Sequence, residues 1–217
     1  MIQWVYERSK KCQELDHLIV ATDDERILNT VKTFGGDAVM TSNKHKTGTE
    51  RCAEVATNNP NYDVIINIQG DEPLIDPAQI KSLIHLFEDD KINIGTLAIQ
   101  STDRNVLKDK NKIKVVTNEY GQALYFSRSS IPCDNAQIES FSFLKHLGMY
   151  GYRYETLLAI SQLKPSSLEI TESLEQLRWM ENGIDIYIAR TEVECFSVDV
   201  PEDIQVILDQ ISHLNLK

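Results

Sequence analysis

The chain has 217 residues, of which 41% are hydrophobic and 25% are charged. These values are typical of a globular domain and exclude collagen-like, disordered and low-complexity chains. The 22 Lys and Arg residues against 33 Asp and Glu residues give a net charge of −11. So acidic a surface repels phosphate backbones and anionic lipid headgroups, which argues against partners of either kind, nucleic acid or membrane.

The cysteines and the apolar segments predict a cytoplasmic protein. The four cysteines are far apart and form no C-x-x-C pair, so neither a structural zinc site nor a disulfide framework is expected. No apolar run approaches the roughly 18 residues that a membrane-spanning helix needs. The opening segment carries Glu7, Arg8 and Lys10, which does not fit a signal peptide.

Helix and strand signals alternate along the first half of the chain. Apolar spacing predicts a helix in the opening residues, a buried strand over 18–21 and a helix that ends at Gly35-Gly36. The elements expected next are a strand over 38–40, a helix from the 45–51 segment to about 57, a strand over 63–69 and a helix over 77–87.

The second half is richer in strand signals. Strands are expected over 94–99, 114–117, 123–127, 147–152 and 184–189, with helices near 154–163, 172–182 and 201–212. No repeat or linker interrupts this alternation. It predicts one α/β domain over residues 1–217, with a mostly parallel central sheet covered by helices on both faces. The later hairpin strands could form a small subsidiary sheet.

Ligands of open α/β sheets bind outside the carboxyl ends of the strands, so polar residues that directly follow a strand are candidate site residues. The first candidates are Gln69 and Asp71, in a Q-G-D-E-P segment that begins at the last residue of the strand over 63–69. An Asp here can hold Mg²⁺ together with substrate phosphates. The alternative is a solvated acidic turn between a strand and a helix.

A second carboxylate, Asp199, stands at an expected strand end before the last helix. Glu202 and Asp203 fit an ordinary first helical turn. If Asp199 lies close to Asp71 in space, Asp199 is a candidate metal ligand, because two carboxylates at one sheet edge can bind a metal ion together.

The third group of candidates is basic and polar. Arg128 follows the strand over 123–127 and could grip a carboxylate in bidentate fashion. His146 precedes an expected strand and could donate to a sugar hydroxyl or a carboxylate, although a single His is often structural. Glu175 and Gln176 lie on an expected helix where such residues usually face solvent. The Lys46-Thr47-Gly48-Thr49 stretch before a helix could present backbone N–H groups to an anion.

Several catalytic motifs are absent from the sequence. Without G-x-G-x-x-G or G-x-x-x-x-G-K-[ST], a dinucleotide-binding Rossmann enzyme or a Walker-type NTPase is disfavoured. Without G-x-S-x-G or H-E-x-x-H, the hydrolase interpretations lose most of their support.

Six segments in order resemble one enzyme family over essentially the whole chain, the 3-deoxy-manno-octulosonate cytidylyltransferases, also called CMP-Kdo synthetases. The segments are H-K-T-G-T-E-R (45–51), N-I-Q-G-D-E-P (67–73), A-L-Y-F-S-R-S-S-I-P (123–132), K-H-L-G-M-Y-G-Y-R (145–153), L-E-Q-L-R (174–178) and V-D-V-P-E-D (198–203). The resemblance implies a Rossmann-like nucleotidyltransferase fold, a homodimer, and a place in lipopolysaccharide biosynthesis.

The resemblance also implies the reaction and its residues. CTP and Kdo, an eight-carbon acidic sugar, would give CMP-Kdo and pyrophosphate with Mg²⁺ as cofactor. Asp71 and Asp199 match the catalytic metal ligands of the family. The positions that match its Kdo site are Gln69, Arg128, His146, Tyr150, Glu175 and Gln176, and those that match its nucleotide pocket are Thr47, Gly48, Thr49 and Arg51. We expect Arg128 to bind the Kdo carboxylate.

The chain departs from the family at its start. Family members open with a strand and a basic loop of the type I-P-A-R-x-x-S-T-R-x-P-G-K, and this sequence begins at Met1-Ile2, where a later segment would fall. The resemblance therefore implies a domain incomplete at its N-terminus, through an internal start site or a truncation. Two alternatives stay open: a related sugar-acid cytidylyltransferase of the CMP-sialic acid type, and an inactive homologue that only binds nucleotide or dimerises.

Overall fold

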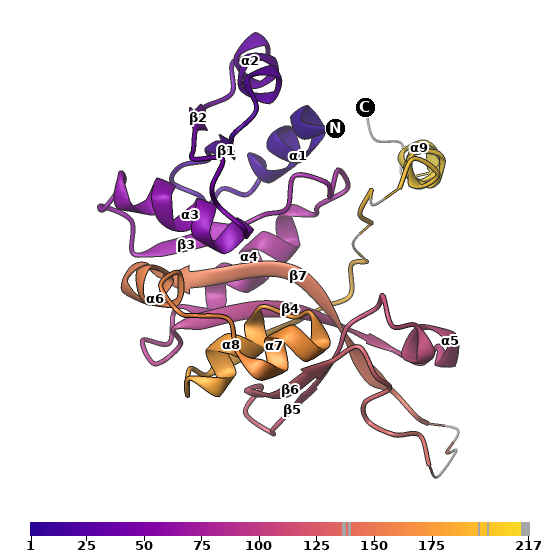
Figure 1. The fold of residues 1–217 in the computed structure, drawn as a ribbon. Coiled ribbons are helices and arrows are strands. Elements are labelled where there is room, and N and C mark those ends of the chain that lie inside the picture. The colour runs from indigo at the N-terminus through magenta and orange to yellow at the C-terminus, as the bar shows by residue number, and fades with distance from the viewer. Residues whose placement is uncertain (136–137, 139, 195, 199, 214–217) are drawn as a thin grey trace.

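Helices and strands alternate along the chain in the computed structural model, which describes residues 1–135, 138, 140–194, 196–198 and 200–213 (Figure 1). The strands are β1 (Val20–Thr22), β2 (Ala38–Met40), β3 (Val64–Asn67), β4 (Ile94–Ser101), β5 (Lys114–Thr117), β6 (Ala123–Ser127), β7 (Phe143–Arg153) and β8 (Ile186–Thr191). The helices are α1 (Ile2–Ser9), α2 (Glu25–Thr33), α3 (Gly48–Thr57), α4 (Pro77–Leu86), α5 (Arg104–Lys108), α6 (Tyr154–Ile160), α7 (Ser167–Glu172), α8 (Gln176–Glu181) and α9 (Asp203–His213).

Most predicted elements are confirmed, and the start of α3 shows why the local sequence forms a helix there. Thr47 is the N-cap residue, and its hydroxyl accepts a hydrogen bond from the backbone N–H of Glu50. Asp24 and Asp76 cap α2 and α4 in the same way, with Pro77 in the first turn of α4. Such caps satisfy N–H groups that have no partner inside the helix.

The single helix predicted over 172–182 is wrong. Ser173 adopts a left-handed conformation with φ of 52°, which ends α7, and α8 begins three residues later. This break turns Glu175 and Gln176 toward the sheet instead of toward solvent, and Gln176 is buried. The short helix α5 has no counterpart among the predicted elements.

The main sheet has six strands, and β7 is central to it. The strand order is β6-β5-β7-β4-β8, and β3 pairs with β7 as well. One edge of β7 pairs with β4, while the other edge pairs with β5 near its start and with β3 near its end. From these pairings, β3, β4, β5 and β8 point one way, and β6 and β7 point the other way.

The predicted α/β class with a central sheet and a small second sheet is confirmed. The prediction that the central sheet is mostly parallel is wrong, because β7 runs antiparallel to β3, β4 and β5, and among the described strands of this sheet only the β4–β8 pair is parallel. The hairpin strands β5 and β6 join the main sheet through β7 rather than forming a sheet of their own. The small second sheet is the parallel pair β1–β2. β1 and β3 do not pair, and a cavity of about 380 Å³ is lined by residues of β1, β3 and α3.

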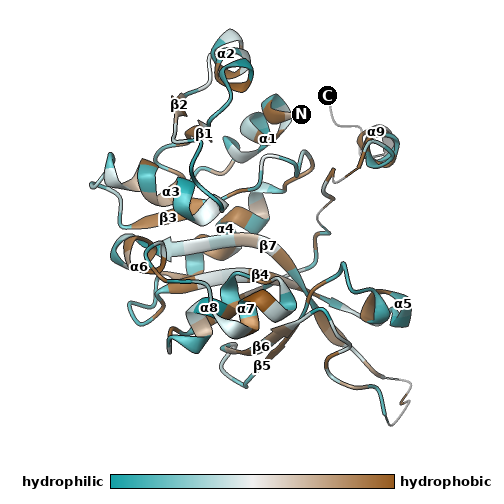
Figure 2. Ribbon diagram, viewed as in Figure 1, coloured by the Kyte–Doolittle hydropathy of each residue, from teal (hydrophilic) through white to brown (hydrophobic). Residues whose placement is uncertain are grey.

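The core has one layer on each face of the sheet. Side chains of α3, α6 and α8 pack on one face, and those of α1 and α4 pack on the other. β7 contributes to both, because Tyr150 and Tyr152 point to the α8 face while Leu147 and Met149 point to the α4 face. This alternation follows from the two-residue period of a strand. Figure 2 shows hydrophobic ribbon concentrated in the strands and on part of α4.

Within the described ranges, no helix is long and apolar enough to cross a membrane. The cysteines there, Cys12, Cys52 and Cys133, are free thiols.

Two glycines let α4 approach the sheet closely. Gly95 on β4 and Gly151 on β7 are register partners. A methyl group at Gly151 would lie 2.6 Å from Cε2 of Phe87 and 3.0 Å from Cδ1 of Ile66. A methyl group at Gly148, on the same strand, would meet nothing within 4 Å.

Gly151→Ala should lower the free energy of unfolding by about 1–3 kcal/mol, because the added methyl overpacks the contact between β7 and Phe87. Gly148→Ala is the matched control and should change it little or raise it by about 0.5 kcal/mol. Urea unfolding of both variants and the wild type provides the measurement. Equal stabilities for Gly151→Ala and Gly148→Ala would contradict this account of the packing.

Candidate active site

The carboxyl ends of β1, β2 and β3 converge on the first turn of α3. Asp23 follows β1 and Thr41 follows β2. The guanidinium of Arg51 donates to Thr41 Oγ1 at 2.5 Å and lies 3.3 Å from the Asp23 carboxylate. This edge of the sheet therefore holds the predicted nucleotide-binding residues Thr47, Gly48, Thr49 and Arg51. The Arg51 side chain points toward β1 and β2, whereas the Thr49 hydroxyl points toward Glu175.

Gly48 brings the start of α3 against the end of β3. A methyl group at Gly48 would lie 3.3 Å from Nδ2 of Asn67 and 3.9 Å from Nε2 of Gln69. A side chain at position 48 would therefore press against the Asn67 side chain. The predicted nucleotide segment and the predicted sugar-binding residue Gln69 are thus direct neighbours.

Asp71 lies two residues after Gln69 and is half-buried. Its backbone carbonyl accepts a hydrogen bond of 2.9 Å from the N–H of Val198. Two contacts anchor the chain shortly before Val198. Gln79 Nε2 donates to the Val193 carbonyl at 2.9 Å, and Lys145 forms an ion pair with Glu194. The residue directly before Asp199 is therefore fixed beside Asp71. Asp199 itself lies outside the described residues, so the meeting of the two carboxylates stays a prediction.

Glu175 connects α8 to the first turn of α3. Thr49 Oγ1 donates to Glu175 Oε2 at 2.9 Å, and Arg178 Nη2 lies 3.3 Å from Glu175 Oε1. Arg178 is itself buried and pairs with Glu169 at 2.7 Å. Burial raises the pKa of Glu175, and the Thr49 and Thr47 hydroxyls oppose that shift. Glu175 and Gln176 thus face the site rather than solvent.

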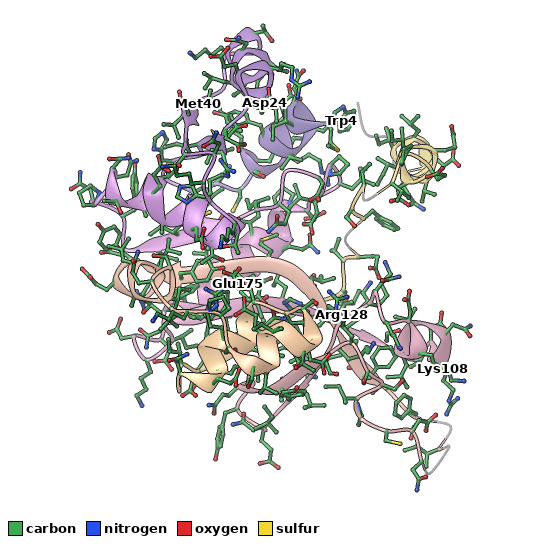
Figure 3. The ribbon with its side chains drawn as sticks, in the orientation of Figure 1. Trp4, Asp24, Met40, Lys108, Arg128 and Glu175 are labelled. Atoms are coloured by element: carbon green, nitrogen blue, oxygen red, sulfur yellow. The ribbon has the colours of Figure 1, made fainter. Side chains whose placement is uncertain are left out.

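Arg128 follows β6, as predicted, and lies beside the end of α7, where Figure 3 labels it together with Glu175. Its guanidinium donates to the backbone carbonyls of Glu172 at 2.7 Å, Lys110 at 3.1 Å and Ser173 at 3.2 Å. These bonds use three of the five N–H donors of an arginine. The remaining donors are those with which it can bind an anionic group.

Two charged residues hold the backbone of Arg128. The Glu172 carboxylate accepts from the Arg128 N–H at 2.9 Å and from Ser127 Oγ at 2.7 Å. The buried ammonium of Lys114 donates to the carbonyls of Arg128, Lys112 and Asp109 at 2.6, 2.7 and 2.8 Å. Burial lowers the pKa of Lys114. All three donors of this ammonium are satisfied, so Lys114 acts as a structural clamp.

His146 and Tyr150 come from β7 and face the same side of the sheet as α8. The His146 ring lies 5.0 Å from the ring of Phe126 and 5.4 Å from that of Tyr150, and Tyr150 meets Trp179 edge-on at 5.2 Å. His146 lies inside β7 rather than before a strand, because the strand starts at Phe143. Burial among these rings lowers the pKa of His146 from 6.5 to about 3, so the imidazole is neutral near pH 7.

The structure joins most of the predicted residues through their neighbours. Gly48 lies near the Gln69 side chain, Thr49 binds Glu175, and Arg128 is anchored to the turn that leads to Glu175. The sequence did not reveal Glu172, Lys114 or Thr96, the last of which contacts His146. The only local signal of Thr96 and Lys114 is a polar side chain next to apolar residues of a strand.

Comparison with known proteins decides the family. A cytidylyltransferase family model matches residues 1–186. The 3-deoxy-manno-octulosonate cytidylyltransferase of Fusobacterium nucleatum is 45% identical over 100% of this chain and 88% of its own length. That of Parabacteroides distasonis is 47% identical over 96% of this chain and 86% of its own. The chain belongs to the 3-deoxy-manno-octulosonate cytidylyltransferase family.

Solved structures agree with this membership. A CMP:2-keto-3-deoxy-manno-octonic acid synthetase complexed with CTP superposes with a TM-score of 0.91 at 38% identity, covering 98% of this chain and 87% of that one. A 4-diphosphocytidyl-2C-methyl-D-erythritol synthase from Anaerococcus prevotii shares the fold, with a TM-score of 0.65 at 12% identity. The nucleotidyltransferase fold predicted for the family is thereby confirmed.

His146 should make the stability of this cytidylyltransferase depend on pH. Because its pKa is about 3 in the folded chain and 6.5 as the ordinary value, between these values the unfolded chain binds a proton that the folded chain does not. The free energy of unfolding should therefore fall as the pH is lowered, by up to about 1.4 kcal/mol per pH unit from this residue.

His146→Gln, which keeps an N–H donor and cannot titrate, should reduce that slope. Urea unfolding of both proteins between pH 7 and 4.5 measures the difference, and other titrating groups contribute equally to both. Identical slopes would mean that the imidazole is not desolvated in the folded state.

Proposed function

We propose that this chain transfers CMP from CTP to the anomeric hydroxyl of Kdo and releases pyrophosphate. The observation that carries the proposal is the match to a CMP-Kdo synthetase complexed with CTP over 98% of the chain. The geometry supports it, since the residues expected to bind nucleotide and sugar meet at one edge of the sheet, around Gly48, Gln69 and Glu175. The product would serve lipopolysaccharide assembly in the cytoplasm.

The sugar side of the site is formed by β7, the end of β6 and the turn between α7 and α8. Arg128 supplies a fixed cation for the carboxylate of Kdo, because its guanidinium plane is already oriented by three carbonyls. His146, Tyr150, Glu175 and Gln176 offer polar atoms to hydroxyl groups. A polyhydroxylated acid fits this combination of one cation and several neutral or weakly acidic groups.

The nucleotide side has little positive charge to offer a triphosphate. Arg51 is paired with Asp23, and Arg178 is paired with Glu169 and Glu175. The first turn of α3 adds N–H groups and the positive end of a helix dipole. This balance favours a divalent cation as the group that neutralises the phosphates.

The residues at the end of β3 fit Mg²⁺. Carboxylate oxygens are the ligands this hard cation prefers, and it usually takes one or two of them together with substrate phosphates. Asp71 supplies such a group, and the hydrogen bond between Val198 and Asp71 brings the chain next to Asp199 to the same place. When bound, Mg²⁺ supplies charge neutralisation at phosphate and lowers the pKa of a nearby hydroxyl.

The transfer itself requires no covalent enzyme intermediate. The anomeric oxygen of Kdo forms a bond to the α-phosphorus of CTP, the bond from that phosphorus to the bridging oxygen breaks, and pyrophosphate leaves with its electron pair. The hydroxyl proton passes to solvent or to a nearby base. Catalysis then rests on aligning the two substrates, for which the residues tied by Thr49, Glu175 and Arg128 provide a fixed frame.

A homodimer completes the proposal. Leu124 on β6 and Ile170 on α7 are large apolar side chains that are 57% and 68% exposed, and a second copy would cover such surfaces. Light scattering of the purified chain measures its mass in solution, and a monomer at micromolar concentration would contradict this part of the proposal.

The test of the function is pyrophosphate release from CTP by folded protein in the presence of Mg²⁺ and a panel of sugar acids. Kdo should support turnover and sialic acid should not. Turnover with sialic acid alone would support the alternative cytidylyltransferase, and stabilisation by CTP without any product would support an inactive nucleotide-binding homologue.

Asp71→Asn should lower kcat by at least about 100-fold, because a charged ligand at the reacting phosphate is lost while the side-chain shape is kept. Asp185→Asn, at an exposed position, serves as the matched control and should keep full activity. Thermal melts show whether both variants are folded. A folded Asp71→Asn enzyme with normal kcat would remove Asp71 from the catalytic site.

Arg128→Lys should raise the KM for Kdo by about tenfold, since an ammonium keeps the charge and loses the planar, bidentate donor pair. The KM for CTP should change far less. Initial rates with each substrate varied separately provide the measurement. If the KM for CTP rises instead, the guanidinium binds the nucleotide and the assignment to the Kdo carboxylate is wrong.

A further inference from the structure

The hydroxyl of Thr96 on β4 meets three polar atoms at once. Its Oγ1 lies 2.9 Å from Nε2 of His146, 2.7 Å from the carbonyl oxygen of Met149 and 3.2 Å from that of Leu147. Thr96 is fully buried, so water does not compete for these contacts. The arrangement connects the interior of the sheet to a predicted sugar-binding residue.

The number of hydrogens decides the direction of each bond. A hydroxyl has one hydrogen and two lone pairs, while a carbonyl oxygen can only accept. The Thr96 hydrogen therefore points to a carbonyl, and Met149 offers the shorter distance. With its hydrogen used, Thr96 Oγ1 can only accept from His146, which must donate from Nε2.

An irregularity of β7 explains why the carbonyl of Met149 needs this donor. The register between β4 and β7 shifts at Thr96, so that Thr96 pairs with Tyr150 and Leu97 with Leu147. Gly148 and Met149 are passed over in this bulge and have no register partner on β4. Buried carbonyl groups outside a regular ladder take donors from side chains.

We propose that Thr96 is a positioning residue that holds His146 as the neutral Nε2–H tautomer, so that Nδ1 accepts a hydrogen bond from a hydroxyl group of the sugar acceptor. The burial that lowers the pKa of His146 keeps the ring neutral. Nδ1 forms no hydrogen bond with any residue that the structure describes, and the Phe126 and Tyr150 rings restrict rotation of the imidazole. This reverses the sequence-based expectation that His146 donates to the sugar.

The proposal rests on the proposed function only for the identity of the acceptor, and the tautomer can be measured without turnover. Long-range proton–nitrogen correlation spectra of protein labelled at its five histidines show which ring nitrogen carries the hydrogen. His146→Gln assigns the signal. The wild type and Thr96→Ser should show the Nε2–H form, and Thr96→Val should lose it or mix it with the Nδ1–H form.

An Nδ1–H form in the wild type, or the same tautomer in Thr96→Val as in the wild type, would overturn the proposal whether or not the enzyme turns over. Thermal melts of both variants show that they are folded. Thr96→Ser is the matched control, because it keeps the hydroxyl and removes the methyl group.

Binding of Kdo in the presence of CTP supplies the second readout. Titration with Kdo should move the Nδ1 resonance of His146, and Thr96→Val should raise the KM for Kdo about threefold to tenfold with little change in that for CTP, as expected for one lost hydrogen bond. Thr96→Ser should restore the wild-type KM. Kdo binding without a change at Nδ1 would contradict the proposed acceptor role, whereas absence of Kdo binding in calorimetry would contradict the proposed function.

Discussion

The antiparallel insertion of β7 between β3 and β4 is the constraint on which the site depends. Two adjacent parallel strands must be joined by a crossover connection. The antiparallel strand β7 has 11 residues, and it pairs with β5 near its start and with β3 near its end. Its alternate residues therefore connect His146, on the predicted sugar-binding side, to the end of β3, where Tyr150 is the register partner of Asn67. The same alternation directs Met149 and Gly151 into the opposite core layer.

Around this strand, the site is held by hydrogen bonds between segments that are distant in sequence. Thr49 and Glu175 are 126 residues apart, and Ser127 and Glu172 are 45 apart. Most of these bonds join a charged group to a neutral partner, which makes them stronger than bonds between neutral groups. They also satisfy charges that burial would otherwise penalise. The result is a set of binding groups whose positions are fixed before substrate arrives, which lowers the entropic cost of aligning two substrates.

The sequence was sufficient to predict the features that depend on neighbouring residues. The helix that begins in the 45–51 segment, the strand that leads to Gln69 and the strand before Arg128 follow from turn residues and apolar runs, and each lies where predicted. The direction of β7 could not be predicted, because a strand pattern carries no information about which neighbour it pairs with. The break at Ser173 was missed because Leu174, Leu177 and Met180 have helical spacing in the sequence, and that spacing does not show that Ser173 is left-handed.

The candidate site residues were found through the family motifs, whereas the residues that position them were not. Glu172, Lys114 and Thr96 act through contacts made only when distant strands and helices come together. In the case of Thr96, the contact depends on a bulge in its partner strand, which the alternating pattern of β7 does not reveal.

The two halves of the candidate site differ in electrostatics. At the end of β3, Asp71 is a half-buried carboxylate that a cation can neutralise. Beside β7, burial keeps His146 neutral and raises the pKa of Glu175, so this side offers hydrogen-bonding groups with less net charge. The cation on this side is Arg128, whose guanidinium is oriented by three backbone carbonyls. Under the proposed function, a divalent cation neutralises the triphosphate and Arg128 neutralises the sugar carboxylate, so this chain of net charge −11 needs no large positive surface to bind two anionic substrates.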